Sequence, residues 1–252
     1  MPGGGKNKTG GLATAKTGRK LGARDGFLAG APVFIGYFSA AVAFGVLARA
    51  GGISLRESFL FSALVFAGAS QFMALNLLQA QIAAVEIILA TLLVNSRHLV
   101  MSAALAARLP EKRSWLILPA AFGVTDETFA VAATREQSFG PVFLLSLGVT
   151  AYSGWVGGTV AGYLLGTTLP PALQNSMGIA LYAMFAAILI PEFKKTRHAL
   201  FLATGAGILH TVLTWGGFFS PGWNLIAAMV LSAALGACFF KEKGGVKERC
   251  PI

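Results

Sequence analysis

The sequence predicts an all-α, polytopic helical membrane protein, and two observations lead to this fold class. Only 12% of the 252 residues are Asp, Glu, Lys or Arg, against about 25% in a typical globular chain, while 55% are hydrophobic. Charge-free stretches of 23, 28, 55 and 42 residues cover positions 26–48, 58–85, 137–191 and 199–240. A bilayer core needs about 20 apolar residues of helix, and none of these stretches alternates like a barrel strand, so they predict spanning helices.

Turn-forming residues divide these stretches into about eight predicted spans, or seven if one does not cross fully. The spans are 27–48, 58–78, 82–107, 115–134, 142–166, 174–190, 199–216 and 223–240. The span at 82–107 is the least regular, because Asn95-Ser96-Arg97-His98 splits its apolar run into two pieces too short to cross alone. This segment is predicted to be a broken helix or a hairpin that re-enters on one side.

Charge along the chain predicts three regions and an orientation. Residues 1–25 are basic and rich in Gly and Thr, which predicts a disordered cytoplasmic tail. Residues 26–240 are expected to form a single transmembrane domain, and 241–252 a second cytoplasmic tail. A cleaved signal peptide is not expected, since the first apolar run is too long. With eight crossings one loop conflicts with the positive-inside rule, because the basic residues at 108–113 would lie outside.

Composition also excludes several classes of protein. Two cysteines, Cys238 and Cys250, cannot make a disulfide framework, and no Cys and His cluster has the spacing of a zinc site. The formal net charge of +10 lies in the tails and short loops, which favours a membrane lipid surface over nucleic acid. No phosphate-binding G-x-x-x-x-G-K-[ST] motif occurs. Neither a metal nor a cofactor is therefore expected.

An internal repeat is one interpretation of the sequence. A shift of 117 residues places 44–47 over 161–164, and the small-residue helix around 63–64 over 180–181. If the two repeats are an even number of spans apart, they have the same orientation in the membrane. If they are an odd number of spans apart, one is inverted relative to the other, and both arrangements occur in transporters. The glycines at 154, 158, 162 and 166 recur every fourth residue, which predicts a smooth packing face on this helix.

Ionisable residues inside the predicted spans carry the functional information. Arg97, His98, Asp126 and Glu127 are the main ones, and each charge at the bilayer centre costs about 2.5–3.5 kcal/mol. The cheapest arrangement brings Arg97 to an acid or lets both share water in a cavity. Such a group is either a structural ion pair between helices or a substrate or proton site. Asp126 and Glu127 are adjacent, so their side chains point in different directions from a helix and cannot both face the same neighbour. One of the two is therefore expected to pair inside the bundle.

Three short polar stretches in the first half of the chain follow a family pattern. These are G-A-S-Q-F at 68–72, N-x-R-H at 95–98 and D-E-x-F at 126–129. In this order and spacing the chain resembles the AzlC family, the large subunit of bacterial branched-chain amino acid exporters, over roughly residues 24–240. Around residues 175–180 that family tends to have a G-L-D-F-A-like stretch, and this sequence has no acid there.

The resemblance implies a secondary transporter that exports branched-chain and related apolar amino acids across the inner membrane. It also implies a small, separately encoded AzlD-like membrane subunit as partner, and a multi-pass protein with a cytoplasmic N-terminus. Residues expected at the substrate or coupling site are Ser70, Gln71, Asn95, Arg97, His98, Asp126 and Glu127. Phe72 and Phe129 are expected to line the pocket for the substrate side chain.

Two other functions are alternatives. One is the permease subunit of an ATP-driven complex, although the short loops offer no obvious coupling helix for an ATPase. The other is an intramembrane hydrolase with Ser153 as nucleophile and His210 as base, since a hydroxyl nucleophile needs such a base within hydrogen-bond reach. The residue two positions before Ser153 is Ala151, where the usual nucleophile turn has glycine. The sequence therefore favours a transporter over an enzyme.

Overall fold

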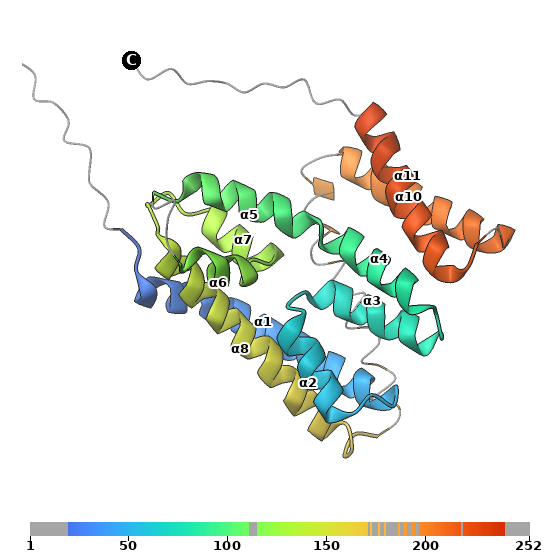
Figure 1. The fold of residues 1–252 in the computed structure, drawn as a ribbon, viewed down its shortest axis with the longest axis horizontal. Helices are drawn as coiled ribbons and strands as arrows, with labels where there is room; N and C mark the ends of the chain where they lie inside the picture. Colours follow the sequence, from blue (N-terminus) through green and yellow to red (C-terminus); the bar gives the residue numbers. More distant parts are fainter. Residues whose placement is uncertain are drawn as a thin grey trace, which may run out of the picture.

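The computed structural model describes residues 20–110, 115–170, 197–217 and 219–239, with scattered positions between 171 and 196. The predicted span at 174–190 and both tails lie largely outside these residues. In the described part the chain is helical, apart from turns and an isolated bridge between Leu21 and Phe139 (Figure 1). The helices are α1 Ala23–Ala50, α2 Leu55–Leu64, α3 Gly68–Gln79, α4 Ala84–Asn95, α5 Arg97–Arg108, α6 Ile117–Phe122, α7 Asp126–Ala133, α8 Pro141–Leu165, α10 Arg197–Gly216 and α11 Pro221–Phe239. The all-α prediction is confirmed.

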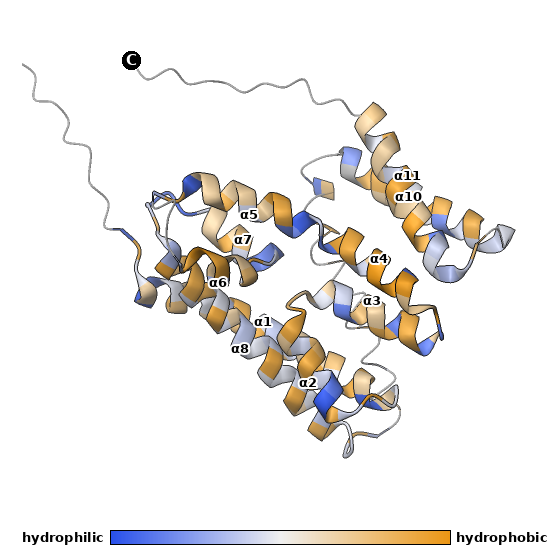
Figure 2. Cartoon of the chain, viewed as in Figure 1, coloured by the Kyte–Doolittle hydropathy of each residue, from blue (hydrophilic) through white to orange (hydrophobic). Residues whose placement is uncertain are grey.

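Four helical segments of the described residues are long and apolar enough to cross a membrane. They are α1, the α4–α5 segment from Ala84 to Arg108, α8 and residues 221–238 of α11, and the apolar part of α10 is slightly shorter. Figure 2 shows hydrophobic residues along the helices and hydrophilic ones mainly at loops and helix ends. Polar patches interrupt this pattern where α4 meets α5 and where α7 begins (Figure 2). The chain is a multi-pass membrane protein.

Helices α1 and α8 pack side by side and run parallel at the centre of the fold (Figure 1). Glycines bring their backbones together: a Cβ built at Gly45 would lie 2.1 Å from the carbonyl oxygen of Thr159. One built at Gly162 would lie 2.1 Å from the carbonyl oxygen of Val42. Close approach of this kind drives helix association in lipid, where the hydrophobic effect is absent. The predicted packing face of α8 is therefore confirmed for Gly162.

The register of α1 and α8 agrees with the proposed repeat of 117 residues. Ala41 and Gly158 are 117 apart, and a Cβ on Gly158 would lie 2.9 Å from the Cβ of Ala41. The contacts of Gly45 with Thr159 and of Gly162 with Val42 also exchange under the same shift. Two parallel helices related by a twofold axis pack in this way. The repeat stays a prediction for the rest of the second half, which lies partly outside the described residues.

The predicted span at 58–78 is a helical hairpin instead of a single helix. Val65, Phe66 and Ala67 leave the helical conformation between α2 and α3. The end of α3 then returns to the end of α1, because a Cβ on Gly51 would lie 2.2 Å from Nε2 of Gln79. Residues from both segments also line one cavity of about 530 Å³. The segment enters and leaves at the same end of the bundle (Figure 1).

The predicted span at 115–134 is also a hairpin. Its two helices, α6 and α7, are separated by Gly123, Val124 and Thr125, and Thr125 caps the start of α7. The end of α7 lies beside the end of α5, since Arg108 donates to the carbonyl oxygen of Ala133 at 2.8 Å. The α6–α7 hairpin therefore starts and finishes at the end of the bundle where α8 begins. The α2–α3 hairpin starts and finishes at the opposite end (Figure 1).

The segment at 84–108 crosses the bundle with one break at Ser96, which agrees with the broken helix, one of the two alternatives that the sequence left open. Ser96 donates its hydroxyl to the carbonyl oxygen of Leu93 at 2.7 Å, which ends α4, and α5 starts at the next residue. This crossing places Arg108 beside the end of α7, where it binds the carbonyl oxygen of Ala133. The start of α1 lies at the same end of the bundle, because the backbone N–H of Leu21 donates to the carbonyl oxygen of Ser138 at 3.0 Å. The sequence left the side of the basic segment at 108–113 open, and the two returning hairpins place its first residue, Arg108, at the end of the bundle where α1 begins.

A thiol-labelling experiment tests this topology. In a background without Cys238 and Cys250, cysteines introduced as Ile53→Cys and Gln81→Cys are expected to react with an impermeant reagent from the same side. A single crossing at 58–78 requires them to react from opposite sides. Glu136→Cys, beyond the second hairpin, is expected to react only from the other face. Labelling of positions 53 and 81 from different faces would show that α2–α3 crosses the membrane.

Helices α10 and α11 form an antiparallel pair that meets the rest of the chain at α4. Glu86, in the first turn of α4, accepts a 2.5 Å hydrogen bond from the Ser220 hydroxyl just before α11. A Cβ on Gly222 would lie 2.3 Å from the same carboxylate, so glycine is needed there for the close approach. Glu86 thus lies in the first turn of α4 and joins this helix to the start of α11.

Candidate functional site

The breaks in the helices meet halfway along α1 and α8. The tip of the α2–α3 hairpin is fixed at mid-α8, because Tyr152 donates to the carbonyl oxygen of Ala63 at 3.0 Å. The tip of the α6–α7 hairpin is fixed at mid-α1 through the hydroxyls of Tyr37 and Thr125, 2.6 Å apart. The two tips also touch each other, with the rings of Phe66 and Phe122 6.2 Å apart. Backbone irregularity deep in a membrane protein is tolerated where protein or a cavity surrounds it.

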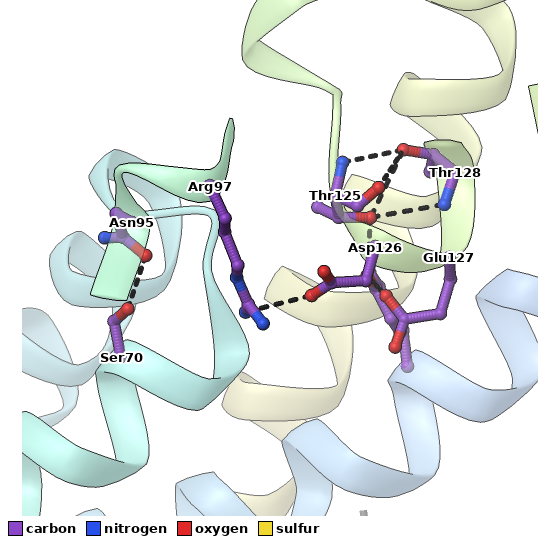
Figure 3. Close-up of polar contacts among 8 residues, drawn as sticks. Ser70, Asn95, Arg97, Thr125, Asp126, Glu127 and Thr128 are labelled. Atoms are coloured by element: carbon purple, nitrogen blue, oxygen red, sulfur yellow. Dashed lines mark hydrogen bonds and ion pairs between the residues drawn. The ribbon is translucent and has the colours of Figure 1, made fainter. Parts of the chain in front are cut away.

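Arg97 and Asp126 form an ion pair at this level of the bundle. Nη2 of Arg97 lies 2.9 Å from Oδ2 of Asp126, and the two side chains are 35% and 28% exposed (Figure 3). Each is the first residue of its helix, so the breaks before α5 and α7 put both side chains at mid-bundle. Among the described residues, Nε of Arg97 is buried and has no hydrogen-bond partner. The guanidinium therefore keeps one donor for another acceptor.

Ser70 and Asn95 connect the α2–α3 hairpin to the same place. The Ser70 hydroxyl lies 2.5 Å from Oδ1 of Asn95, two residues before Arg97 (Figure 3). Ser70 is buried in the first turn of α3, and the start of this helix has no side-chain cap. The first amides of α3 therefore carry the positive end of the helix dipole near the ion pair.

The hydroxyl of Tyr37 binds Glu127 at the start of α7 and links it to two threonine hydroxyls. Tyr37 binds a carboxylate oxygen of Glu127 as well as the Thr125 hydroxyl. Thr125 and Thr128 cap the helix reciprocally, since the Thr125 amide donates to the Thr128 hydroxyl at 2.8 Å (Figure 3). Thr128 in turn donates to the carbonyl oxygen of Gly123 at 2.8 Å. Asp126 and Glu127 consequently face different partners, as their adjacency in sequence predicted.

Gln71 is fully buried and holds the α2–α3 break. Its amide nitrogen donates to the carbonyl oxygens of Phe61, at 3.1 Å, and Val65. Its oxygen accepts the Trp155 indole N–H at 2.9 Å and the Ser62 hydroxyl at 3.3 Å. Gly68 lies directly under the Trp155 ring. Every hydrogen-bonding position of the Gln71 amide is thus used within the protein.

Three further predicted residues lie around this centre without meeting at one point. His98 follows Arg97 in α5 and is half-buried. Phe72 is 2% exposed and packs in the aromatic core, with its ring 5.4 Å from Phe44. Phe129 is partly buried in a separate cluster that contains Phe139. The structure brings Arg97, Asp126, Asn95 and Ser70 together, while the two phenylalanines occupy different clusters.

Sequence reasoning missed Tyr37, Thr125 and Trp155. Each lies in an apolar run, where a single hydroxyl or indole group gives no pattern to recognise. The one available signal was Thr125 itself, because threonine three residues before Thr128 and directly before two acids is typical of a helix start. That signal predicts the break before α7, and with it the position of Asp126.

Comparisons with known proteins agree with this architecture. The family model described as AzlC protein matches residues 32–169, which include most of α1, both hairpins, the ion pair and all of α8. The chain belongs to the AzlC family. No solved structure matches it.

Relatives of this AzlC family member include an uncharacterized membrane protein of Archaeoglobus fulgidus, 35% identical over 73% of this chain and 82% of the relative. The inner membrane protein YgaZ of Escherichia coli is 31% identical over 71% of this chain and 76% of its own. The branched-chain amino acid transport protein AzlC of Bacillus subtilis is 24% identical over 74% of both chains. The family is one of transport proteins.

Family membership decides against the hydrolase alternative. In the structure Ser153 is exposed on α8 and donates its hydroxyl to the carbonyl oxygen of Thr150 at 2.8 Å, within its own helix. Such a bond is common for serine in an apolar helix. Among the described residues, no group of three or more His, Cys, Asp or Glu side chains is placed to hold a metal ion. The chain belongs to a family of transport proteins and is not an enzyme.

Proposed function

We propose that this protein is a secondary transporter that exports branched-chain and related apolar amino acids across the inner membrane. The observation that carries the proposal is the Arg97–Asp126 pair at the level where three helix breaks meet. Opposite charges deep in a membrane bundle are costly and are typical of substrate or ion pathways. A zwitterion carries the two charges that complement this pair.

The geometry supports a definite orientation of the solute. The free Nε donor of Arg97 and the uncapped start of α3 favour the carboxylate of the amino acid. Asp126 is then the partner for its ammonium group. Ser70 and Asn95 contribute polar contacts between these two ends. In this proposal Gln71 acts by holding the hairpin tip in place, since its hydrogen bonds are already satisfied.

The aliphatic side chain of the solute is proposed to lie against apolar residues near the pair. Phe129 is partly buried one turn after Asp126, while Phe72 contributes from the core beneath α3. Selectivity among aliphatic amino acids is expected to be loose, because one methylene in such a pocket is worth about 1–3 kcal/mol.

Orientation and access follow from the two hairpins. We propose a cytoplasmic N-terminus, because Lys20, Arg108 and Arg135 then lie on the cytoplasmic side. The hairpins reach the site from opposite ends of the bundle, which suits a carrier that opens to one side at a time. Coupling to protons through Glu127 or His98 is the simplest source of energy.

Two further parts of the proposal come from the family resemblance. A small AzlD-like membrane subunit is proposed as partner, and co-purification with a membrane protein of that kind tests it. The permease of an ATP-driven complex remains the second candidate; efflux that requires ATP and persists without a proton gradient would favour it.

Flux measurements test the main proposal. Membrane vesicles containing the protein and its partner subunit are loaded with labelled leucine, isoleucine, valine or methionine, and a proton gradient is imposed. We expect gradient-driven movement of these amino acids and little movement of lysine or glutamate, whose side-chain charge the apolar surroundings exclude. Vesicles without the protein are the control. If none of the four amino acids moves, the proposed function is wrong.

A further inference from the structure

We propose that Glu127 is the group that takes up and releases the coupled proton, through a hydrogen-bond chain with Tyr37, Thr125 and Thr128. The inference rests on the proposed transport function and assigns different tasks to the two adjacent acids. Asp126 pairs with Arg97, whereas Glu127 contacts no described cation and is bound by a hydroxyl.

The chain of hydroxyls is built from three buried side chains. Tyr37, on the unbroken helix α1, is 7% exposed, and Thr125 and Thr128 are also buried. The Tyr37 oxygen contacts Glu127 and lies 2.6 Å from the Thr125 hydroxyl, which lies 3.2 Å from the Thr128 hydroxyl. The far end is fixed, because Thr128 donates to the carbonyl oxygen of Gly123 and accepts the amide of Thr125.

Counting hydrogens shows that the ionised carboxylate is fully accommodated. Each hydroxyl has one hydrogen to donate and can accept from a neighbour. With Glu127 ionised, Tyr37 donates to the carboxylate. The Thr125 hydroxyl then turns its hydrogen from Thr128 towards the Tyr37 oxygen 2.6 Å away, which reverses the Tyr37-to-Thr125 bond of the structure. Thr128 keeps its bond to Gly123. Every hydroxyl hydrogen has an acceptor in this arrangement.

The protonated carboxyl is accommodated equally well by reversing the chain. Glu127 then donates to Tyr37, Tyr37 donates to Thr125, and Thr125 donates to Thr128. No heavy atom has to move, since only hydroxyl hydrogens rotate. A site that satisfies both protonation states avoids the penalty of an unpaired buried polar group in either one. This property is what a group that gains and loses a proton during a transport cycle requires.

Asp126 lacks this property. Its carboxylate accepts from the Arg97 guanidinium at 2.9 Å, and a proton there would remove the charge that compensates Arg97. Of the described charged and titratable groups, Tyr37 from α1 binds Glu127, and Asp126 is its neighbour in sequence. Arg97 and His98 lie on α5, which packs against α7 and whose arginine pairs with Asp126. Helix α8, which also packs on α7, carries no Asp, Glu, Lys, Arg or His.

Coupling follows from the adjacency of the two acids. A proton on Glu127 removes one negative charge beside Asp126 and so weakens the local attraction for an ammonium group. Proton and amino acid then oppose each other's binding, and this coupling is reciprocal. Mutual opposition of the two ligands is the requirement for exchanging a proton on one side for an amino acid on the other.

Infrared difference spectroscopy of the full-length protein in lipid tests the proton site without measuring transport. Acidification is expected to build up carbonyl bands from the ten Asp and Glu carboxylic acids of the protein, and the component shifted by a hydrogen bond to Tyr37 is the band expected for Glu127. Glu127→Gln should remove this band, Asp126→Asn should keep it, and Tyr37→Phe should shift it to the frequency of a carboxyl without this hydrogen bond. Tyr163→Phe, a matched change near the end of α8, should leave the band in place. If the acid-induced spectrum of Glu127→Gln is the same as that of the unmodified protein, with the Glu127 component absent from both or kept in both, the proposal is overturned.

Transport measurements separate this proposal from the function on which it rests. Glu127→Gln should lower proton-driven net efflux by about 100-fold, the scale of losing a positioned proton-transfer group. Exchange of labelled for unlabelled leucine, which needs no proton movement, should continue. If the unmodified protein moves no amino acid, the transport proposal fails and the infrared band still decides the proton site. If it transports and Glu127→Gln keeps gradient-driven efflux, the proton site is wrong and the transport function stands.

Discussion

Arg97→Ala is expected to lower export of branched-chain amino acids by about 100-fold or more, the effect of losing one or two charge-assisted hydrogen bonds. In the structure Arg97 offers Nη2 to Asp126 and keeps Nε free. Alanine removes the donors proposed for the substrate carboxylate and leaves Asp126 without its cation. The measurement is flux of labelled leucine in vesicles with equal amounts of protein. Arg49→Ala is the matched control, because Arg49 also lies in a helix and donates to a carbonyl oxygen, that of Tyr163, but near the end of the bundle.

The double variant Arg97→Met, Asp126→Leu separates a binding role from a structural one. Replacing a buried ion pair by apolar residues of similar size is often neutral or stabilising, whereas removing one partner is costly. The double variant is therefore expected to be at least as stable as either single variant. If the pair only joins α5 to α7, transport should recover together with stability. If the pair binds the solute, transport stays absent in a folded protein, and recovery of export would contradict our proposal.

The sequence predicted those candidate site residues whose charged side chains have the highest free-energy cost inside a membrane. Arg97, Asp126 and Glu127 were singled out because charges rarely occur in apolar helices, and an ion pair of Arg97 with one acid was one of two expected arrangements. The break at 95–97 was visible because its polar residues interrupt an apolar run. The packing of glycines on α8 followed from their spacing and was also confirmed for Gly162.

The hairpins could not be predicted from hydropathy. Residues 58–78 and 115–134 are apolar and long enough to cross, and hydropathy does not record the direction in which the second part of a segment runs. Their breaks depend on tertiary contacts: Tyr152 binds the end of α2, and Tyr37 binds the start of α7. The distribution of basic residues did point to the hairpins. The residues at 108–113 conflict with the positive-inside rule if both segments cross, and they agree with it if both segments return to the side where they entered.

Parallel packing of α1 and α8 agrees with this topology, but three crossings between them would also make them parallel, so the hairpins rest on their own contacts. Two membrane helices run parallel only when an odd number of crossings lies between them. With both hairpins returning, the α4–α5 segment is the single crossing between α1 and α8. The hairpin tips then come from opposite sides and meet at Phe66 and Phe122. The site is thus enclosed by two short, separately anchored segments between two tightly packed, unbroken helices.

Gln71→Leu is expected to give the largest loss of stability, because Gln71 joins the parts that form the tip of the first hairpin. Leucine has a similar volume but leaves two carbonyl oxygens, of Phe61 and Val65, and two donors, of Trp155 and Ser62, without this partner. The two carbonyl oxygens keep backbone N–H donors and the Ser62 hydroxyl keeps Thr159, so the Trp155 N–H is the group left unpaired, at a cost of about 1–3 kcal/mol. Thermal unfolding in detergent measures the effect.

Gln79→Leu is the matched control, since Gln79 is exposed at the end of the same helix and the change should stay within about 0.5 kcal/mol. Gln71→Glu adds a second test, because a carboxylate keeps the acceptor for Trp155 but cannot donate to the two carbonyl oxygens. We expect Gln71→Glu to be destabilised nearly as strongly as Gln71→Leu. If both variants unfold like the parent protein yet lose transport, Gln71 contacts the solute directly, and the hairpin tip is held by Trp155 and Gly68 instead.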